Sequence, residues 1–204
     1  GKAANNQMIK KLGIFTFVVT VFFFLLFFYK GNVANEYSLK LREPTTINAV
    51  RDSLRAHSVI ENTYIFDLVY LIYEVKSVPA GHYRLKKSMT SFDILRKLKF
   101  GRQDPIRWTI STATFVEELA GKAADKLGMD SLDFIRVIYD STQLRQRGYS
   151  KENALALFLP NTYEIYWNTS PEDLLTKIHR ETEKFWNAER RAKAQKLNLQ
   201  PSEV

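Results

Sequence analysis

The first clear pattern of hydrophobic positions is a continuous apolar run near the N-terminus. Residues 12–29 (LGIFTFVVTVFFFLLFFY) contain no charged side chain and lie between Lys11 and Lys30. At about 1.5 Å per residue, a helix of this length spans roughly 27 Å, close to the hydrocarbon thickness of a bilayer. Because the run is apolar on every face, it predicts a transmembrane helix rather than a core helix.

The charges beside this run indicate how it would be oriented. Three lysines precede it without any acidic residue, whereas both signs of charge follow it. This bias predicts that residues 1–11 are cytoplasmic and that the rest of the chain is translocated. A cleaved signal peptide is the alternative, but the run is longer than a typical signal and residues 30–37 (KGNVANEY) offer a poor cleavage site. We therefore expect a retained, single-pass anchor.

Residues 37–110 mix alternating and helical patterns. Alternation over residues 37–41, 82–85 and 106–110 predicts short strands. Apolar positions at helical spacing follow Thr45 or Thr46, recur over residues 61–75, and follow a capping box at residues 90–93. We interpret residues 37–110 as a small α+β module.

Residues 111–204 are mostly helical in pattern. A capping box at residues 114–117 predicts a helix that ends at Gly128, and Asp130 begins another. Residues 152–159 read as a short helix and residues 164–167 as a strand. Ser170 and Pro171 predict the start of a long helix that continues to Lys196. The whole chain is therefore expected to be α+β, with an N-terminal membrane helix.

Composition narrows the chemistry. The chain has 204 residues, a formal net charge of +8 and no cysteine, which excludes a disulfide framework and a thiol nucleophile. The positive charge suits anionic lipid headgroups, acidic wall polymers or nucleic acid, although scattered solvated charges are the simpler interpretation. The three histidines lack metal-ligand spacing, so we expect no metal site and no cofactor.

The most unusual local segment is FLPNTYE, residues 158–164. Proline fixes the backbone, while amide, hydroxyl and aromatic groups together suit the hydroxyls and C–H faces of a sugar. A structural turn whose Asn bonds its own backbone explains the segment equally well. The glutamate could line a cleft or simply face solvent. The candidate substrate-binding residues are Phe158, Pro160, Asn161, Thr162, Tyr163 and Glu164.

Several segments, in this order, resemble one known family. They are GHYRL (81–85), MTSFDILRKLKFG (89–101), TFVEELAGKAADKLG (114–128) and FLPNTYEIYWNTS (158–170). Together with the N-terminal anchor they resemble the YceG-like endolytic murein transglycosylases, in the form found in Bacteroidetes. Most relatives have aspartate where this chain has Asn161, so the chain lacks a charge that they carry at that position.

The resemblance implies a fold, an activity and a location. Residues 37–110 would be a LysM-like module, and residues 111–204 the N-terminal part of a catalytic domain that cuts glycan strands in nascent peptidoglycan and limits their length. One glutamate would protonate the glycosidic oxygen and then activate the sugar's own 6-hydroxyl, giving a 1,6-anhydro end. The protein would be a lyase of the inner (cytoplasmic) membrane with a periplasmic C-terminal part. Its partners would be glycan strands, the membrane and peptidoglycan synthases, without nucleic acid or cofactor.

The resemblance assigns no catalytic residue within the chain. In the family the glutamate follows a segment like residues 197–204, so we expect the acid beyond Val204 and assign the role to neither Glu164 nor Glu203. A non-catalytic wall-binding or scaffold module is the alternative. DNA binding fits the charge but no motif. A pyridoxal-phosphate lyase, a label that related sequences have carried, needs a lysine in a cofactor site that nothing here marks.

Overall fold

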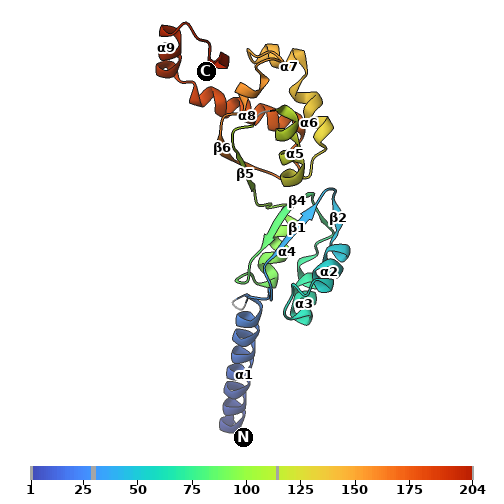
Figure 1. Ribbon diagram of the computed structural model, residues 1–204. Coiled ribbons are helices and arrows are strands. Elements are labelled where there is room, and N and C mark those ends of the chain that lie inside the picture. The colour runs from blue at the N-terminus through green and yellow to red at the C-terminus, as the bar shows by residue number, and fades with distance from the viewer. Residues whose placement is uncertain (1, 29–30, 114, 204) are drawn as a thin grey trace. The chain divides into compact units, whose positions relative to one another are not determined.

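The apolar run near the N-terminus forms part of one long helix in the computed structural model, which describes residues 2–28, 31–113 and 115–203. Helix α1 spans Lys2–Phe28 (Figure 1), and its segment Gln7–Phe24 is long and apolar enough to cross a membrane. The hydroxyl of Thr16 donates to the Leu12 carbonyl at 2.9 Å, so this polar side chain is satisfied within the helix. Tyr29, the last residue of the predicted span, lies outside the described residues.

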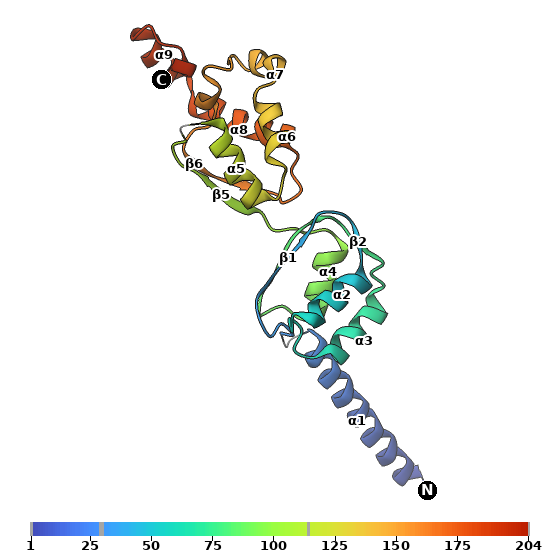
Figure 2. The ribbon, with the colours of Figure 1, turned by 45° about the vertical axis from the view of Figure 1, so that its right-hand side comes forward.

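The rest of the chain combines helices with two-stranded sheets, which confirms the α+β class. It divides into two compact units, residues 1–104 and residues 105–204, which we describe separately. In unit 1, strand β1 pairs antiparallel with β4, β2 pairs with β3, and helices α2, α3 and α4 lie to one side of the β1–β4 pair (Figure 2). The elements after α1 are β1 (Tyr37–Leu41), β2 (Thr45–Thr46), α2 (Ile47–Ala56), α3 (Thr63–Tyr73), β3 (Ser77–Val78), β4 (Gly81–Leu85) and α4 (Ser91–Lys99).

Polar caps define where the helices of unit 1 begin. The Thr46 hydroxyl accepts from the Ala49 amide, and Asn62 caps α3 in the same way. At α4 the predicted capping box is confirmed, since Thr90 and Asp93 each accept a hydrogen bond from the backbone of the other. These caps satisfy amides that would otherwise lack partners.

A buried asparagine ties the segment after α1 to unit 1. Asn32 accepts from the Asn62 amide at 2.6 Å and donates through Nδ2 to Ser91 Oγ at 2.7 Å. Its own amide donates to the Met89 carbonyl at 2.8 Å. A single asparagine gives no periodic signal, so the sequence did not predict these contacts. The structure shows that it is locked to the first turns of both α3 and α4.

Unit 2 is built on the antiparallel pair of β5 and β6, with α5 packed against α6 and α6 against α8 (Figure 1). Its elements are β5 (Ile106–Ile110), α5 (Val116–Leu127), α6 (Ser131–Ile138), α7 (Ser141–Gln146), the 3₁₀ turn η1 (Ala154–Leu157), β6 (Asn161–Ile165), α8 (Pro171–Phe185), α9 (Ala188–Lys196) and the 3₁₀ turn η2 (Pro201–Glu203). Gly128 ends α5 with φ +67°, a left-handed conformation, and a Cβ there would collide with the Trp167 ring.

Several sequence-based boundaries are wrong. We grouped Ile106–Ile110 with the first module, but β5 pairs with β6, and Trp108 on β5 is buried opposite Tyr163. The helix predicted to run to Lys196 is broken before Asn187, whose side chain caps α9. The first residue of the predicted capping box at 114–117 lies outside the described residues, and α5 begins after Phe115 without a side-chain cap. Helix α7 was not predicted at all.

Candidate functional site

Strand β6 contains most of the predicted site. It begins at Asn161, earlier than predicted, so residues 161–163 form a strand and not a turn. Tyr163 and Ile165 point into the core, whereas Thr162 and Glu164 are exposed on the opposite face, as strand alternation requires. The Tyr163 hydroxyl donates to the Leu159 carbonyl at 2.9 Å and holds the segment before the strand against it.

The structure separates the six predicted site residues into two groups. Phe158 and Tyr163 are buried, at 6% and 3% exposure, and the Phe158 ring meets Phe134 edge to face with centroids 6.2 Å apart. Pro160, Asn161, Thr162 and Glu164 are exposed. The Tyr163 ring is therefore not accessible for stacking on a sugar in this structure, because nearly all of its surface is buried.

The exposed face of the β5–β6 pair is polar. Thr109 Oγ1 and Thr162 Oγ1 are hydrogen-bonded across the strands at 2.9 Å, and Arg107 lies opposite Glu164 in the register. The amide of Thr162 donates to Asn161 Oδ1 at 2.8 Å. This face presents hydroxyl, amide, carboxylate and guanidinium groups within one short ladder, a mixture that can bind a polyhydroxylated ligand.

A cleft of about 200 Å³ lies beside the same segment. Its lining is mainly apolar and includes Ile110, Leu155, Phe158, Leu159, Pro160 and Trp186. Trp186 is 6% exposed, and its indole Nε1 is buried without a hydrogen-bond partner. A buried N–H donor without an acceptor is uncommon, because leaving it unpaired costs about 1–3 kcal/mol. The cleft therefore offers a mainly apolar surface, and Trp186, one of its lining residues, has a buried indole nitrogen without a partner.

Trp186 falls within the long helix predicted to run from Ser170 and Pro171 to Lys196, but in the structure it stands where α8 ends and the chain turns toward α9. Asn187, which caps the next helix, was the available signal for that break. Behind the cleft, the buried Thr182 hydroxyl donates to the Leu157 carbonyl at 2.7 Å and joins α8 to η1.

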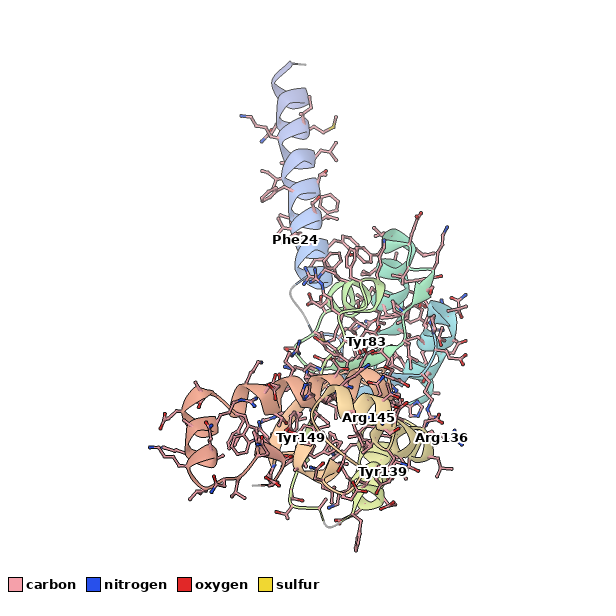
Figure 3. All side chains as sticks on the ribbon, turned by 90° about the horizontal axis from the view of Figure 1, so that it is seen from above. Phe24, Tyr83, Arg136, Tyr139, Arg145 and Tyr149 are labelled. Carbon is pink, nitrogen blue, oxygen red and sulfur yellow. The ribbon has the colours of Figure 1, made fainter. Side chains whose placement is uncertain are left out.

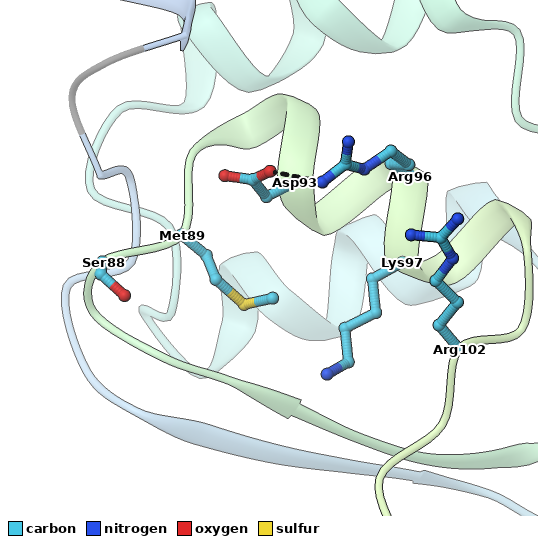
Figure 4. Close-up of a pocket in the computed structure, with 6 residues that line it drawn as sticks. All are labelled: Ser88, Met89, Asp93, Arg96, Lys97 and Arg102. Atoms are coloured by element: carbon cyan, nitrogen blue, oxygen red, sulfur yellow. Dashed lines mark hydrogen bonds and ion pairs between the residues drawn. The ribbon is translucent and has the colours of Figure 1, made fainter.

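A second cavity, of about 280 Å³, lies in unit 1 against α4 (Figure 4). Its lining includes Arg96, Lys97 and Arg102, but two of these cations are paired: Arg96 with Asp93 at 3.2 Å and Lys97 with Asp104 at 2.7 Å. Burial alone would raise the pKa of Asp104, but hydrogen bonds from Lys97 and from the Arg84 amide outweigh it and hold the pKa below its ordinary value. The charges of this cavity are thus largely satisfied.

The described carboxyl groups do not include an obvious general acid. Such a group needs a raised pKa in a partly desolvated site. The pKa of Asp104 and that of Glu152 are both lowered, the latter chiefly by a hydrogen bond from Ser150. Glu164 is exposed, and Glu203 accepts from the Gln200 amide at 2.7 Å. Among the described residues, no group of three or more potential metal ligands occurs.

Comparison with known proteins identifies the family. The profile of the YceG-like family matches residues 39–204, so this chain belongs to that family. Among solved structures, a crystal structure of a protein from Listeria monocytogenes described as YceG-like matches with a TM-score of 0.44 and 17% identity. The match covers 80% of this chain and 59% of that protein, so the chain spans less than two thirds of that protein's length. No curated protein matches this chain.

Proposed function

We propose that this protein is a membrane-anchored endolytic lytic transglycosylase that cleaves the glycan strands of nascent peptidoglycan and limits their length. The observation that carries the proposal is membership of the YceG-like family over residues 39–204. We further propose that residues 37–104 act as a LysM-like glycan-binding module, and that residues 105–204 belong to the catalytic domain. Partners would be glycan strands, the membrane and peptidoglycan synthases.

The proposed reaction needs one carboxylic acid and no water. The acid donates its proton to the glycosidic oxygen as the bond to C1 breaks, and the departing sugar leaves with a free hydroxyl. The resulting carboxylate then takes the proton of the 6-hydroxyl, whose oxygen bonds to C1 and closes the 1,6-anhydro ring. Attack within one sugar avoids the entropy cost of recruiting a second molecule. We propose no residue of this chain as the acid.

The role we propose for the residues of unit 2 is binding. The cleft beside Pro160 combines an apolar lining with the unpartnered Trp186 Nε1, and an N-acetyl group combines a methyl with a carbonyl acceptor. We therefore propose that the cleft binds the acetamido group of an amino sugar. The neighbouring polar face of β5–β6, with Asn161, Thr162 and Glu164, would bind hydroxyls of the same glycan strand.

Helix α1 supports the location that we propose. Its length and apolar surface suit a single membrane span, and the lysines before it favour a cytoplasmic N-terminus. The C-terminal part would then be periplasmic, where nascent glycan strands are made. Protease added outside spheroplasts is expected to digest residues 31–204, and protection of that part would contradict this topology.

Product analysis tests the reaction itself. The protein should release fragments with 1,6-anhydro ends from glycan strands, detected by mass spectrometry. Products with reducing ends only would show that the protein hydrolyses the glycosidic bond, and would contradict the transglycosylase reaction. Binding without any cleavage would favour the alternative, a non-catalytic wall-binding or scaffold module.

Trp186→Phe tests the cleft. The change removes the indole N–H and keeps an aromatic ring, so we expect glycan affinity to fall about 5- to 10-fold, as the loss of one hydrogen bond of roughly 1–1.5 kcal/mol implies. Trp167→Phe is the matched control, because Trp167 packs at Gly128. Affinity should be measured by calorimetry on purified glycan strands. Equal effects of the two substitutions would show that Trp186 does not bind the ligand.

A further inference from the structure

Helix α3 exposes an apolar stripe to solvent. Tyr64, Leu68, Leu71 and Ile72 are 83%, 48%, 70% and 75% exposed. Their positions fall within an arc of roughly 100° on the helix, since each residue turns the helix by about 100°. On the opposite side, Phe66 and Val69 are buried in the core of unit 1, so the stripe is additional to the face that folds the protein.

Two polar side chains of α3, Asp67 and Tyr70, contact α2. Asp67 is paired with Arg55 and lies 3.8 Å from Arg51, both on α2. The Tyr70 hydroxyl is 3.4 Å from Asn48 Oδ1, and the Arg51 guanidinium lies over the Tyr70 ring. Asp67, the acidic side chain within α3, is thus paired inside the unit, while the exposed Glu61 and Glu74 lie before and after the helix.

The covalent chain keeps the start of α3 close to the end of α1. Helix α1 ends at Phe28, and Asn32 is locked by hydrogen bonds to Asn62, the cap of α3. Four Cα–Cα steps separate Phe28 from Asn32, so they are at most roughly 14 Å apart. A bilayer that contains α1 therefore lies within reach of the first turn of α3, whatever path the intervening residues follow.

We propose that α3 lies in the interface of the bilayer into which α1 inserts, with Tyr64, Leu68, Leu71 and Ile72 among the headgroups and upper acyl chains. This inference rests on the membrane part of the proposed function. Helices with one apolar face bind at this depth, and tyrosine is favoured there. Lys99 donates to the Tyr73 carbonyl at 3.0 Å, which puts a cation for anionic headgroups at the C-terminal end of the helix.

Attachment through both α1 and α3 would orient unit 1 on the membrane. A single helix joined by a short segment allows the following residues to rotate about the membrane normal and to tilt away from it. A second contact through α3 removes most of that freedom. The β1–β4 pair and the cavity at α4 would then keep a constant height above the lipid. A constant height would be useful for a protein that binds glycan strands close to the membrane.

The absence of cysteine from the sequence makes the test direct, because single cysteines can be introduced for spin labelling. Labels at Leu71 and Ile72 report α3, a label at Val18 reports the anchor, and a label at Glu43 is the aqueous control. Glu43 is exposed. It follows the C-terminal end of β1, the end that is farther along the chain from α1. The intact chain is reconstituted in vesicles of phosphatidylcholine and phosphatidylglycerol, and collision with oxygen is compared with collision with a water-soluble nickel complex.

We expect labels 18, 71 and 72 to favour oxygen several-fold over the nickel complex, and label 43 to show the reverse. Nickel access at 71 and 72 with oxygen preference at 18 would overturn the docking of α3 and leave the anchor intact. Nickel access at 18 would overturn the anchor itself. Protection of 71 and 72 from both reagents would mean that protein covers α3, either a partner or a second copy, and would also overturn the inference.

A charge substitution adds a second readout. Leu71→Asp with Ile72→Asp changes only exposed positions, so the melting temperature should stay close to that of the parent chain. A label at Tyr64 in this variant should become several-fold more accessible to the nickel complex, because the stripe loses its apolar surface. Unchanged accessibility at that label would contradict a lipid contact along the helix.

Discussion

Strands β4 and β6 contain the same hydrogen-bonding arrangement in two different surroundings. On β4 the buried Tyr83 hydroxyl donates to the Pro79 carbonyl at 2.8 Å, and on β6 the buried Tyr163 hydroxyl donates to the Leu159 carbonyl at 2.9 Å. Each tyrosine thus fixes the backbone four residues before it, and each strand pairs with a strand formed earlier in the chain. Figure 3 shows Tyr83 within unit 1, surrounded by side chains.

The residues around the two tyrosines differ. Next to Tyr83, His82 is buried and both ring nitrogens are bonded: Nε2 to Ser38 Oγ at 2.7 Å and Nδ1 to the Asp104 carbonyl at 3.1 Å. Next to Tyr163, Thr162 and Glu164 are exposed and the nearby Trp186 Nε1 is unpartnered. The same tyrosine arrangement therefore has different neighbours in the two units. Beside Tyr83 the ring nitrogens of His82 are hydrogen-bonded, whereas the cleft in unit 2 is lined by a tryptophan whose indole nitrogen has no partner. The unpartnered Trp186 Nε1 is the feature on which the binding site that we propose in unit 2 depends.

The largest expected effect comes from removing either tyrosine ring. Tyr83→Ala and Tyr163→Ala should each lower the free energy of unfolding of their own unit by about 3–5 kcal/mol, because a large buried side chain leaves a cavity. All three tryptophans, Trp108, Trp167 and Trp186, lie in unit 2, so tryptophan fluorescence follows that unit while circular dichroism follows both.

The matching phenylalanine variants separate the ring from its hydroxyl. Tyr83→Phe and Tyr163→Phe should cost only about 1 kcal/mol, the net value of a hydrogen bond, in urea unfolding curves. A small cost for Tyr163→Ala, with a large loss of glycan affinity, would contradict the structural role we assign to that ring and restore the sugar contact first expected from the sequence.

The next largest effect is on pH dependence, and it distinguishes the two units through one histidine each. Burial lowers the pKa of His82, and the Asp104 carbonyl and carboxylate oppose this only in part. Burial also lowers the pKa of His179, opposed by Glu183 and assisted by Arg147. Both histidines are favoured neutral in the folded state. The unfolded chain binds their protons near pH 6.5, so the free energy of unfolding should fall as pH drops below about 6.5.

Substitution should remove this dependence one unit at a time. His82→Gln should flatten the change in stability of unit 1 between pH 7.5 and 5, and His179→Gln should do the same for unit 2. His57→Gln is the control, because His57 is exposed. If the slopes of stability against pH survive both substitutions, other groups cause them.

The smallest expected effect is on the exposed polar ladder. Thr109→Val with Thr162→Val removes the hydroxyl pair on the solvent face of β5–β6 and should change the stability of unit 2 by less than about 1 kcal/mol, the range for cross-strand pairs. If this face binds sugar hydroxyls, the loss in free energy of glycan binding should exceed the loss in free energy of unfolding. A variant with unchanged affinity would limit the site to the cleft at Trp186.

Residues close together in the chain determined much of the fold. The apolar run gave α1, the Thr90–Asp93 box gave α4, and Gly128 gave the end of α5, because capping and periodicity depend on neighbours within a few positions. The sequence also located the candidate site at residues 158–164, since the segment is chemically unusual. It left open whether that segment binds a ligand or forms structure.

Only the tertiary structure decided which of those side chains is accessible. The partner of β5 lies more than fifty residues away, and that pairing buries Tyr163 against Trp108. The bonds of Asn32, the unpartnered nitrogen of Trp186 and the exposure of the α3 stripe likewise depend on contacts between distant segments. Local patterns cannot specify them, because burial and hydrogen-bond satisfaction are properties of the packed molecule.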